Sequence, residues 1–268
     1  MNKLRDCMIF GALLLASCAH RPVDDPADPL EPVNRAVFSF NTKADHYVLR
    51  PVAKGYVAVT PDWTRRGVSN FFDNLFYPKT IVNDMLQAKF TTGLSDTGRF
   101  LTNTIFGIGG VMDVGTRWGL PKHDEDFGQT LGYWGVGEGW FLMLPLLGPS
   151  DNRDLVGYAA GIPLNPVNYL PSDYDWLKLS LSAGNLVNQR ANLLPTDSLV
   201  DSQLDPYLAV RTAYLQRRQA LVYDGNPPME NLQLGDDGDG AASAAKAGVD
   251  AKSRSGHESM AEQAQPAK

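Results

Sequence analysis

Apolar residues recur at spacings of three and four through most of the chain, which is the pattern of amphipathic helices. The first such stripe covers residues 30–48. Asp28 is expected to cap this helix, with Pro29 at the first helical position and Glu31 completing a capping box. Pro51 is expected to end it, because proline disrupts a helix interior. The chain therefore opens its folded part with a helix.

The same periodicity, interrupted by glycine and proline, continues almost to residue 225. Further helices are predicted at 52–59, over 62–105 with breaks, at 150–160, at 173–193 and from 205 to 225. Few segments alternate with period two, and the best strand candidates are Leu131 and 140–144. These flank three glycines between 135 and 139, so a small glycine-rich hairpin is predicted. The fold class expected is mainly α, in a single domain over residues 28–225.

The N-terminus carries the pattern of a secretory signal. Lys3 and Arg5 precede an apolar run over 8–16, and small residues follow it. This run is about half the ~20 residues that a membrane-spanning helix needs. Residues 1–17 are therefore interpreted as a cleaved signal peptide.

Cys18 stands directly behind the predicted cut, as in bacterial lipoproteins. We expect its amine to be N-acylated and its sulfur to carry S-diacylglycerol, with 18–27 serving as a lipidated tether. Ala19 favours sorting to the outer membrane, in the periplasmic leaflet. The alternative is a secreted protein in which Cys18 is incidental.

Charge and composition narrow the choice of partners. The net charge is −6, which argues against nucleic acid as a partner. Cys7 leaves with the signal, so no disulfide is expected. Residues 226–268 contain few large apolar side chains and are predicted to be a disordered low-complexity tail.

Motifs for catalysis and metal binding are weak. His46 and His123 lie far apart and no H-E-x-x-H surrounds them, so no metal site is expected. No G-x-S-x-G nucleophile elbow occurs either. The carboxylates at 124–126 are interpreted as a solvated turn or the start of a helix. We expect no cofactor and no enzymatic activity, although a triad assembled from distant residues stays open.

Two segments are apolar and rich in glycine. Residues 106–114 are interpreted either as a tightly packed core crossing or as a surface that touches lipid. Residues 132–145 add an aromatic run that a soluble monomer would struggle to cover, and they are interpreted either as a mobile hairpin that touches the membrane or as plain core. The aromatic residues predicted to contact a membrane are Tyr133, Trp134, Trp140 and Phe141.

Read in order, short strings along the chain resemble the MlaA (VacJ) family of outer-membrane lipoproteins. The strings are DPLEPVNR (28–35), FSFN (38–41), RPV (50–52), GVSNFFDNL (67–75), RF (99–100), NTIFGIGG (103–110), DV (113–114), DFGQTLG (126–132), LPLLGPS (144–150), RD (153–154), DPY (205–207) and RTAY (211–214). Each string alone is weak, but their order over 28–224 is specific.

The resemblance implies a ring-shaped helical protein in the periplasmic leaflet of the outer membrane of a Gram-negative bacterium. It implies an amphipathic channel that removes misplaced phospholipids from the outer leaflet and so maintains lipid asymmetry. The implied partners are phospholipids, an outer-membrane porin trimer and a soluble periplasmic lipid carrier. Phe38, Phe40 and Asn41 match a family segment beside this channel.

The glycines at 135, 137 and 139 match a hairpin that would gate the channel: Gly135, Gly137 and Gly139. Two alternatives to a transfer channel remain. One is an envelope phospholipid hydrolase, and the other is a structural lipoprotein that only bridges membrane and envelope.

Overall fold

The structure, a computed structural model, describes residues 28–228. The predicted signal peptide, the tether with Cys18, and the tail from residue 229 onward lie outside the described residues. Residues 28–227 belong to one compact unit. The predicted domain boundaries stay predictions.

The unit is built mainly of helices with one two-stranded sheet, as the sequence predicts. In chain order its elements are α2 (Glu31–Ala44), η1 (Asp45–Leu49), α3 (Arg50–Val59), α4 (Asp62–Phe76), α5 (Pro78–Leu86), α6 (Phe90–Ile105), α7 (Val114–Arg117), α8 (Phe127–Tyr133), β1 (Phe141–Leu144), β2 (Gly148–Asp151), α9 (Asn152–Gly161), η2 (Ile162–Leu164), η3 (Pro166–Tyr169), η4 (Ser172–Tyr174), α10 (Asp175–Leu193), η5 (Leu194–Thr196), α11 (Asp197–Asp201) and α12 (Pro206–Val222).

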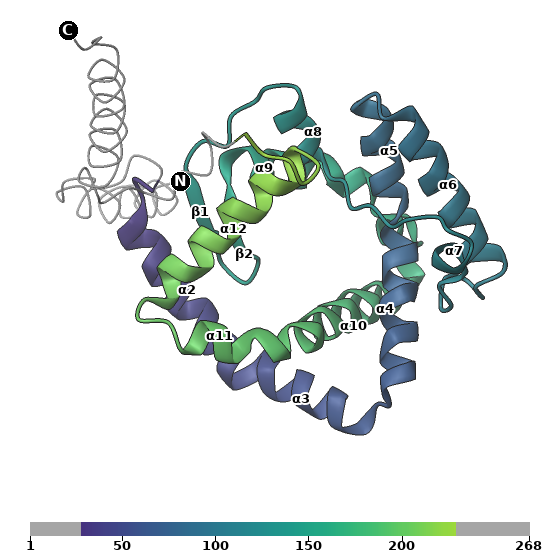
Figure 1. The fold of residues 1–268 in the computed structure, drawn as a ribbon. Helices are drawn as coiled ribbons and strands as arrows, with labels where there is room; N and C mark the ends of the chain where they lie inside the picture. The colour runs from purple at the N-terminus through teal and green to yellow at the C-terminus, as the bar shows by residue number, and fades with distance from the viewer. Residues whose placement is uncertain (1–27, 229–268) are drawn as a thin grey trace, which may run out of the picture. The chain divides into compact units, whose positions relative to one another are not determined.

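These elements contact one another in a closed circuit (Figure 1). From α2 the chain runs through η1 into α3, which packs on α10, and α10 packs on α4. The circuit continues from α4 through α5, α8 and α9 to β2, and β1 returns it to α2. Helix α6 packs against α5, and α7 packs against α6. The ring-shaped helical domain that the family resemblance implies is therefore confirmed.

The first helix differs from its prediction at both ends. Asp28 does not cap it, because its buried carboxylate accepts hydrogen bonds from the Asn34 amide and the Tyr207 hydroxyl. The chain also remains helical through Pro51, where the sequence predicts an end. The π-helical turn η1 precedes this proline, and the Arg50 amide bonds the carbonyl of Asp45, five residues back. Pro51 then occupies the first turn of α3, where its missing N–H costs little.

The hairpin lies one segment later than predicted. Leu131 is part of α8, and β1 pairs antiparallel with β2, Phe141 opposite Asp151 and Leu144 opposite Gly148. The glycines at 135–139 precede the first strand instead of forming its turn. The apolar run over 140–144 indicated a strand but not its partner, because pairing depends on the register that the tertiary contacts select.

Two asparagines of α2 satisfy the outer edge of β1. The Asn34 side chain donates to the Phe141 carbonyl at 3.0 Å and accepts from the Met143 amide at 2.9 Å. Seven residues later, Asn41 donates to the Leu144 carbonyl at 2.9 Å and accepts from the Leu146 amide at 2.8 Å. The two asparagines are two helical turns apart, and this distance matches the spacing of the backbone groups that they bond along β1. Helix α2 thereby covers a strand edge whose backbone groups would otherwise lack hydrogen-bond partners.

The apolar core is small and lies between the hairpin, α2 and α12. Its buried centre is Phe141, Met143 and Tyr207, with Phe38 packed edge-on against the Tyr207 ring. Only 1% of Phe141 is exposed. The prediction that Phe141 contacts a membrane is therefore wrong, because its alternate position on β1 turns it inward.

Most buried positions are polar. Among the described residues, 9 buried residues are hydrophobic and 20 are polar or charged. Globular proteins in water show the opposite preference. Buried charges are stable only with partners, so the polar interior must be organised in networks.

One network joins α8, α9 and α12. Arg218 on α12 donates to Asp126 at 2.7 Å and to Asp154 at 2.6 Å, and the Tyr214 hydroxyl also donates to Asp154. Burial alone would raise the pKa of Asp126, but the hydrogen bonds and charge of Arg218 outweigh it and lower the pKa to about 2. Asp126 therefore stays ionised and holds the three helices together.

A second network joins α5, α6 and the start of α8. Asp84 and Asp96 are both fully buried, and Asp96 accepts from the Tyr77 hydroxyl and lies 2.9 Å from Nδ1 of His123. Burial, followed by the hydrogen bond and charge of Asp96, raises the pKa of Asp84 to about 7. Glu125 adds to this rise and Lys89 opposes it. Asp84 is therefore a carboxyl group that holds a proton near neutral pH.

Asp84→Asn is expected to change how stability depends on pH. The folded pKa of about 7 lies above the ordinary value of 3.8, so the stabilisation that the bound proton gives is lost as pH rises through 7. The amide mimics the protonated acid and cannot ionise. The variant should match the wild type in melting temperature near pH 4 and exceed it by several degrees near pH 8, because the wild type loses stability progressively between pH 4 and pH 7.

Thermal unfolding across this pH range checks the prediction, with exposed Asp175→Asn as the control. Parallel curves for the wild type and Asp84→Asn would contradict the assignment of a raised pKa to Asp84.

Phe141→Ala and Trp140→Ala should differ sharply in stability, although the residues are neighbours. Phe141 is 1% exposed and Trp140 is 52% exposed. Removing the buried ring should cost about 3–5 kcal/mol, and removing the exposed ring about 0.5 kcal/mol or less. Urea unfolding of the purified variants measures both, and equal losses would show that the hairpin faces the other way.

Candidate functional site

Helix α6 is inverted, with apolar residues outside and polar residues inside. Its exposed large residues are Phe90, Leu94, Leu101 and Ile105. Its buried residues are Gly93, Asp96, Arg99, Thr102 and Asn103. The exposed set repeats near 3.6 residues and forms one face, with Phe90 61% and Leu94 68% exposed. A continuous apolar face of this kind marks a surface that contacts lipid or another apolar partner.

The glycine-rich segment after α6 extends this face. Gly107 and Gly110 have no room for a side chain, since a Cβ would lie 2.3 Å from the Asn103 carbonyl and from the Asn74 side chain, respectively. The residues between and around them point outward: Phe106, Ile108, Val111 and Met112 are exposed. Residues 106–114 therefore combine the two interpretations given from the sequence. The glycine backbones are tightly packed, and the apolar side chains form an exposed surface.

The second glycine-rich segment connects α8 to β1. Tyr133, Trp134 and Trp140 are exposed, and the Trp134 indole donates to the Leu86 carbonyl at 3.2 Å. Membrane contact by these three aromatic residues stays a prediction. An apolar ring with one satisfied polar edge suits the boundary between lipid and water.

The three predicted gate glycines differ from one another. Gly135 and Gly139 adopt positive φ of 88° and 73°, which L side chains rarely tolerate. Gly137 has ordinary φ and nothing within 4 Å of a built Cβ. Glycine is therefore required by the backbone at Gly135 and Gly139, and only Gly137 is free of a structural requirement.

The predicted channel residues on α2 also have separate surroundings. Phe38 packs in the apolar core and Asn41 holds the hairpin turn, whereas Phe40 is exposed. Hairpin residues Leu146 and Leu147 are exposed beside Asn41. The structure thus brings Asn41 to the hairpin but gives both Phe38 and Asn41 a role in folding, and their part in a channel stays a prediction.

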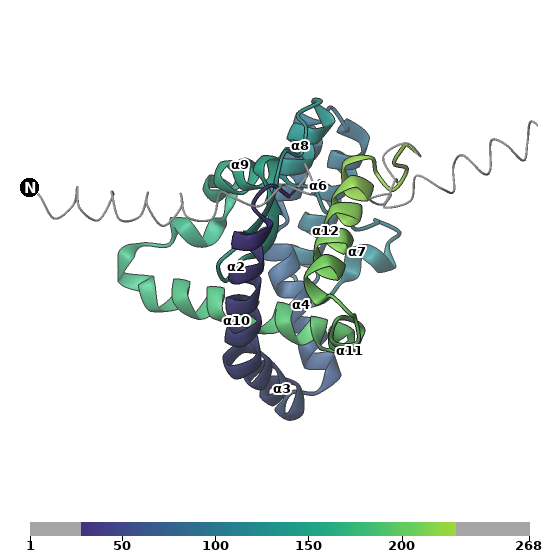
Figure 2. The same cartoon turned by 90° about the vertical axis from the view of Figure 1, so that its left-hand side faces the viewer.

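A further exposed apolar region covers α9, the beginning of α10 and the segment that connects them. Figure 2 shows this segment projecting to one side of the circuit. Its exposed large residues include Val156, Tyr158, Ile162, Tyr169, Tyr174, Trp176 and Leu179.

None of the helices in the described part of the chain is long and apolar enough to span a bilayer.

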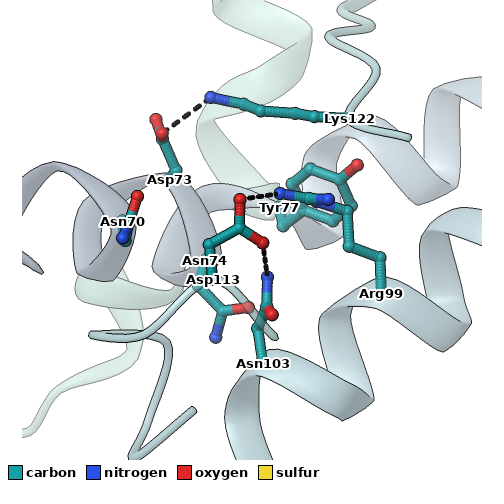
Figure 3. A pocket seen from close by; sticks show the side chains of 8 residues that line it. All are labelled: Asn70, Asp73, Asn74, Tyr77, Arg99, Asn103, Asp113 and Lys122. Atoms are coloured by element: carbon teal, nitrogen blue, oxygen red, sulfur yellow. Dashed lines mark hydrogen bonds and ion pairs between the residues drawn. The ribbon is translucent and has the colours of Figure 1, made fainter. Parts of the chain in front are cut away.

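A polar cavity of about 140 Å³ lies between α4, α6 and the loops around α7 (Figure 3). Its lining residues are Asn70, Asp73, Asn74, Tyr77, Arg99, Asn103, Asp113 and Lys122. Arg99 is held by Asp113 at 2.7 Å, and Lys122 pairs with Asp73 at 2.6 Å. Burial opposes ionisation of Asp113, but hydrogen bonds from Thr116 and Arg99 lower its pKa. The two cations of this cavity are balanced by two carboxylates.

A second cavity, of about 230 Å³, adjoins the first at Asn70, which lines both. It lies where the beginning of α4 meets the end of α10. Its lining residues are Asp62, Arg65, Arg66, Ser69, Asn70 and Asn192. Its two guanidinium groups face one carboxylate, so its lining is net positive.

Sequence reasoning missed both cavities. The pattern that could have predicted them is a polar stripe on α4, in which Arg66, Asn70, Asp73 and Tyr77 are spaced four, three and four residues apart. These residues share a face of the helix, whereas Phe72 and Ser69 on other positions face α10, contacting Gly184 and Asn188.

Catalytic or metal chemistry gains no support from the described residues. No group of three or more potential metal ligands comes together among residues 28–228. His123 pairs with Asp96, and no serine or cysteine hydrogen-bonds His123 in the described part of the chain. Cys18, the predicted lipid attachment site, lies outside the described residues.

Comparison with known proteins agrees with the arrangement described above. A family model described as MlaA lipoprotein matches residues 26–221. Proteins named "Intermembrane phospholipid transport system lipoprotein MlaA" from Shigella flexneri and Escherichia coli K12 are 38% and 37% identical, over 85% of this chain and 93% of theirs. An uncharacterized protein of Rickettsia felis is 38% identical over 73% of this chain and 78% of its own.

A solved structure has the same fold. It comes from work called "Structural basis for maintenance of bacterial outer membrane lipid asymmetry" and is 36% identical in sequence. The match has a TM-score of 0.65 and covers 74% of this chain and 99% of the other. With a family model over most of its length and relatives above 30% identity, this chain belongs to the MlaA lipoprotein family.

Proposed function

We propose that this protein moves phospholipids, removing those misplaced in the outer leaflet of the outer membrane and passing them to a soluble periplasmic carrier. The observation that carries the proposal is the inverted distribution of polarity: polar networks are buried between the helices of the closed circuit, and large apolar side chains are left exposed. The names of the relatives from Shigella flexneri and Escherichia coli support it.

The physical requirement of such transport is two environments along one path. A phospholipid headgroup needs polar groups that replace water, and its acyl chains need apolar surface, because an unsolvated charge is costly. The polar cavities along α4 and the apolar face of α6 lie on neighbouring elements and offer both. Transfer by this route breaks no covalent bond, and we propose that the protein is not an enzyme.

The lipid anchor would determine where the protein lies in the cell envelope. We propose that Cys18 carries the lipid that holds the protein to the periplasmic leaflet, with the exposed aromatic residues Tyr133, Trp134 and Trp140 entering the headgroup layer. An outer-membrane porin trimer is the proposed neighbour. Acyl chains on Cys18 at ~0.8 kcal/mol per buried CH₂ would anchor the chain firmly.

Deleting the gene should raise the phospholipid content of the outer leaflet and the sensitivity of the cells to detergent with chelator. Restoring the wild-type gene should reverse both effects.

A Cys18→Ser chain should be recovered with the soluble periplasmic fraction, and it should restore neither the lipid asymmetry nor the detergent resistance of the deletion strain. Unchanged lipid asymmetry in the deletion strain would reject the proposed function.

A phospholipid hydrolase, the alternative from the sequence, predicts a different result in vitro. Purified protein incubated with phospholipid vesicles would then release fatty acid or lysophospholipid. We expect no release, because transfer leaves the lipid intact.

Gly137→Val should slow lipid transfer and leave the fold intact. The position has space for a side chain and ordinary φ, so the variant should fold, but valine restricts the backbone of the segment between α8 and β1. We expect a several-fold lower rate of transfer from the outer membrane at normal protein levels. Gly55→Val, also at an open position, is the control, and an unchanged rate in Gly137→Val would exclude a mobile gate here.

A further inference from the structure

The net positive cavity at the start of α4 contains one charge that the fold does not use. Arg66 is exposed, and within residues 28–228 its guanidinium has no ion-pair or hydrogen-bond partner. Every other cation that lines the two cavities is engaged: Arg99 by Asp113, Lys122 by Asp73 and Arg65 by Asp62. A free guanidinium in a concave site is positioned for an anion that comes from outside the chain.

Its neighbour Arg65 has a structural task instead. One Arg65 nitrogen donates to the carbonyls of Val57 at 3.1 Å and Thr60 at 2.8 Å, and the other nitrogen bonds Asp62. Arg65 thereby closes the corner between α3 and α4 and occupies the one carboxylate of the cavity. Arg66 is left without local neutralisation.

Neutral groups that line the same cavity are fixed by hydrogen bonds. The Ser69 hydroxyl donates to Asn188 at 3.1 Å and accepts from the Asn192 amide at 3.2 Å. The second N–H of the Asn192 amide remains available as a donor. The N-terminal end of α4, a helix of 15 residues, adds its positive dipole end to the same place. Donors and positive potential therefore converge on one cavity.

The size and surroundings of the cavity select the chemistry of the ligand. Its volume of about 230 Å³ exceeds that of several water molecules at about 30 Å³ each, which is enough for a phosphate group. Arg is the side chain best suited to phosphate oxygens, because its N–H groups form a planar fork. Two large apolar residues near this corner, Val59 and Trp63, are exposed and offer surface for acyl chains.

We infer that the cavity lined by Arg66, Ser69 and Asn192 binds a phosphate group, carried by a phospholipid headgroup. The inference rests on the proposed function for its lipid source, since free phosphate offers the same oxygens. Arg66 supplies the charge, Asn192 a further donor, and Arg65 holds the corner that shapes the cavity.

Calorimetric titration of the full-length protein in a maltoside detergent, which carries no phosphate, tests this site. The probes are dihexanoylphosphatidylethanolamine, inorganic phosphate, and dihexanoylglycerol as the lipid without phosphate. The phospholipid should bind, and Arg66→Gln should weaken it about tenfold or more, as expected for loss of a charge-assisted hydrogen bond. Arg217→Gln on α12, an exposed arginine remote from both cavities, should leave binding unchanged.

Three outcomes decide the question. Equal affinity of Arg66→Gln and the wild type, with intact folding by circular dichroism, overturns the site. Binding of inorganic phosphate as tight as the phospholipid, lost in Arg66→Gln, supports the phosphate site and rejects a lipid source. Binding of dihexanoylglycerol equal to that of the phospholipid overturns recognition of phosphate.

The site and the proposed function fail in distinguishable ways. If deletion of the gene leaves lipid asymmetry unchanged while Arg66-dependent binding persists, the function is wrong and the site stands. If deletion disturbs asymmetry and Arg66→Gln binds normally, the function stands and the site is wrong.

Discussion

Buried charges remain ionised in a fold only where opposite charges and hydrogen bonds surround them. This condition is met at the joints of the circuit, where elements distant in sequence meet. Arg218 binds Asp126 and Asp154 across 92 and 64 residues of chain. Arg190 of α10 binds Asp45 of η1 across 145 residues. With a small apolar core, these networks hold the ring closed, and loss of one partner would leave the other charge buried and unpaired.

The same constraint explains the exposed apolar surface. Polar side chains occupy the contacts between helices, so the large apolar residues of α6 and of the segment between α9 and α10 are left outside. In water this distribution would favour aggregation, whereas beside lipid it lowers the free energy of the protein. Fold stability and the proposed lipid function therefore depend on one distribution of polarity, which also accounts for polar cavities next to apolar faces.

Much of the local structure was predictable from short-range rules. The start of α12 at the Asp205–Pro206 pair, the cap of α9 by Asp151 and the position of α10 as the longest of the described helices follow from capping and periodicity. Predictions failed where a residue had an interaction partner far away in the sequence. The Asp28 carboxylate bonds the side chains of Asn34 and Tyr207 rather than the first backbone amides of α2, and Phe141 turns inward onto Tyr207 and Met143. The polar stripe of α4 was readable in the sequence, but the walls that make it a cavity come from α10 and α6.

The sequence by itself determined the helical class, the starts of α9 and α12 set by capping residues and proline, the expected lipoprotein signal at Cys18 and the family. These depend on neighbours within a few residues, or on ordered strings that need no geometry. Only the tertiary structure decided which aromatic residues are buried, which asparagines cover the edge of β1, and which arginine is left unpaired. The first two depend on partners far apart in the chain, as for Asn34 with Phe141 across 107 residues. The third depends on the corner between α3 and α4, where Arg65 takes Asp62 and leaves Arg66 without a partner among the described residues. Local patterns do not decide these outcomes.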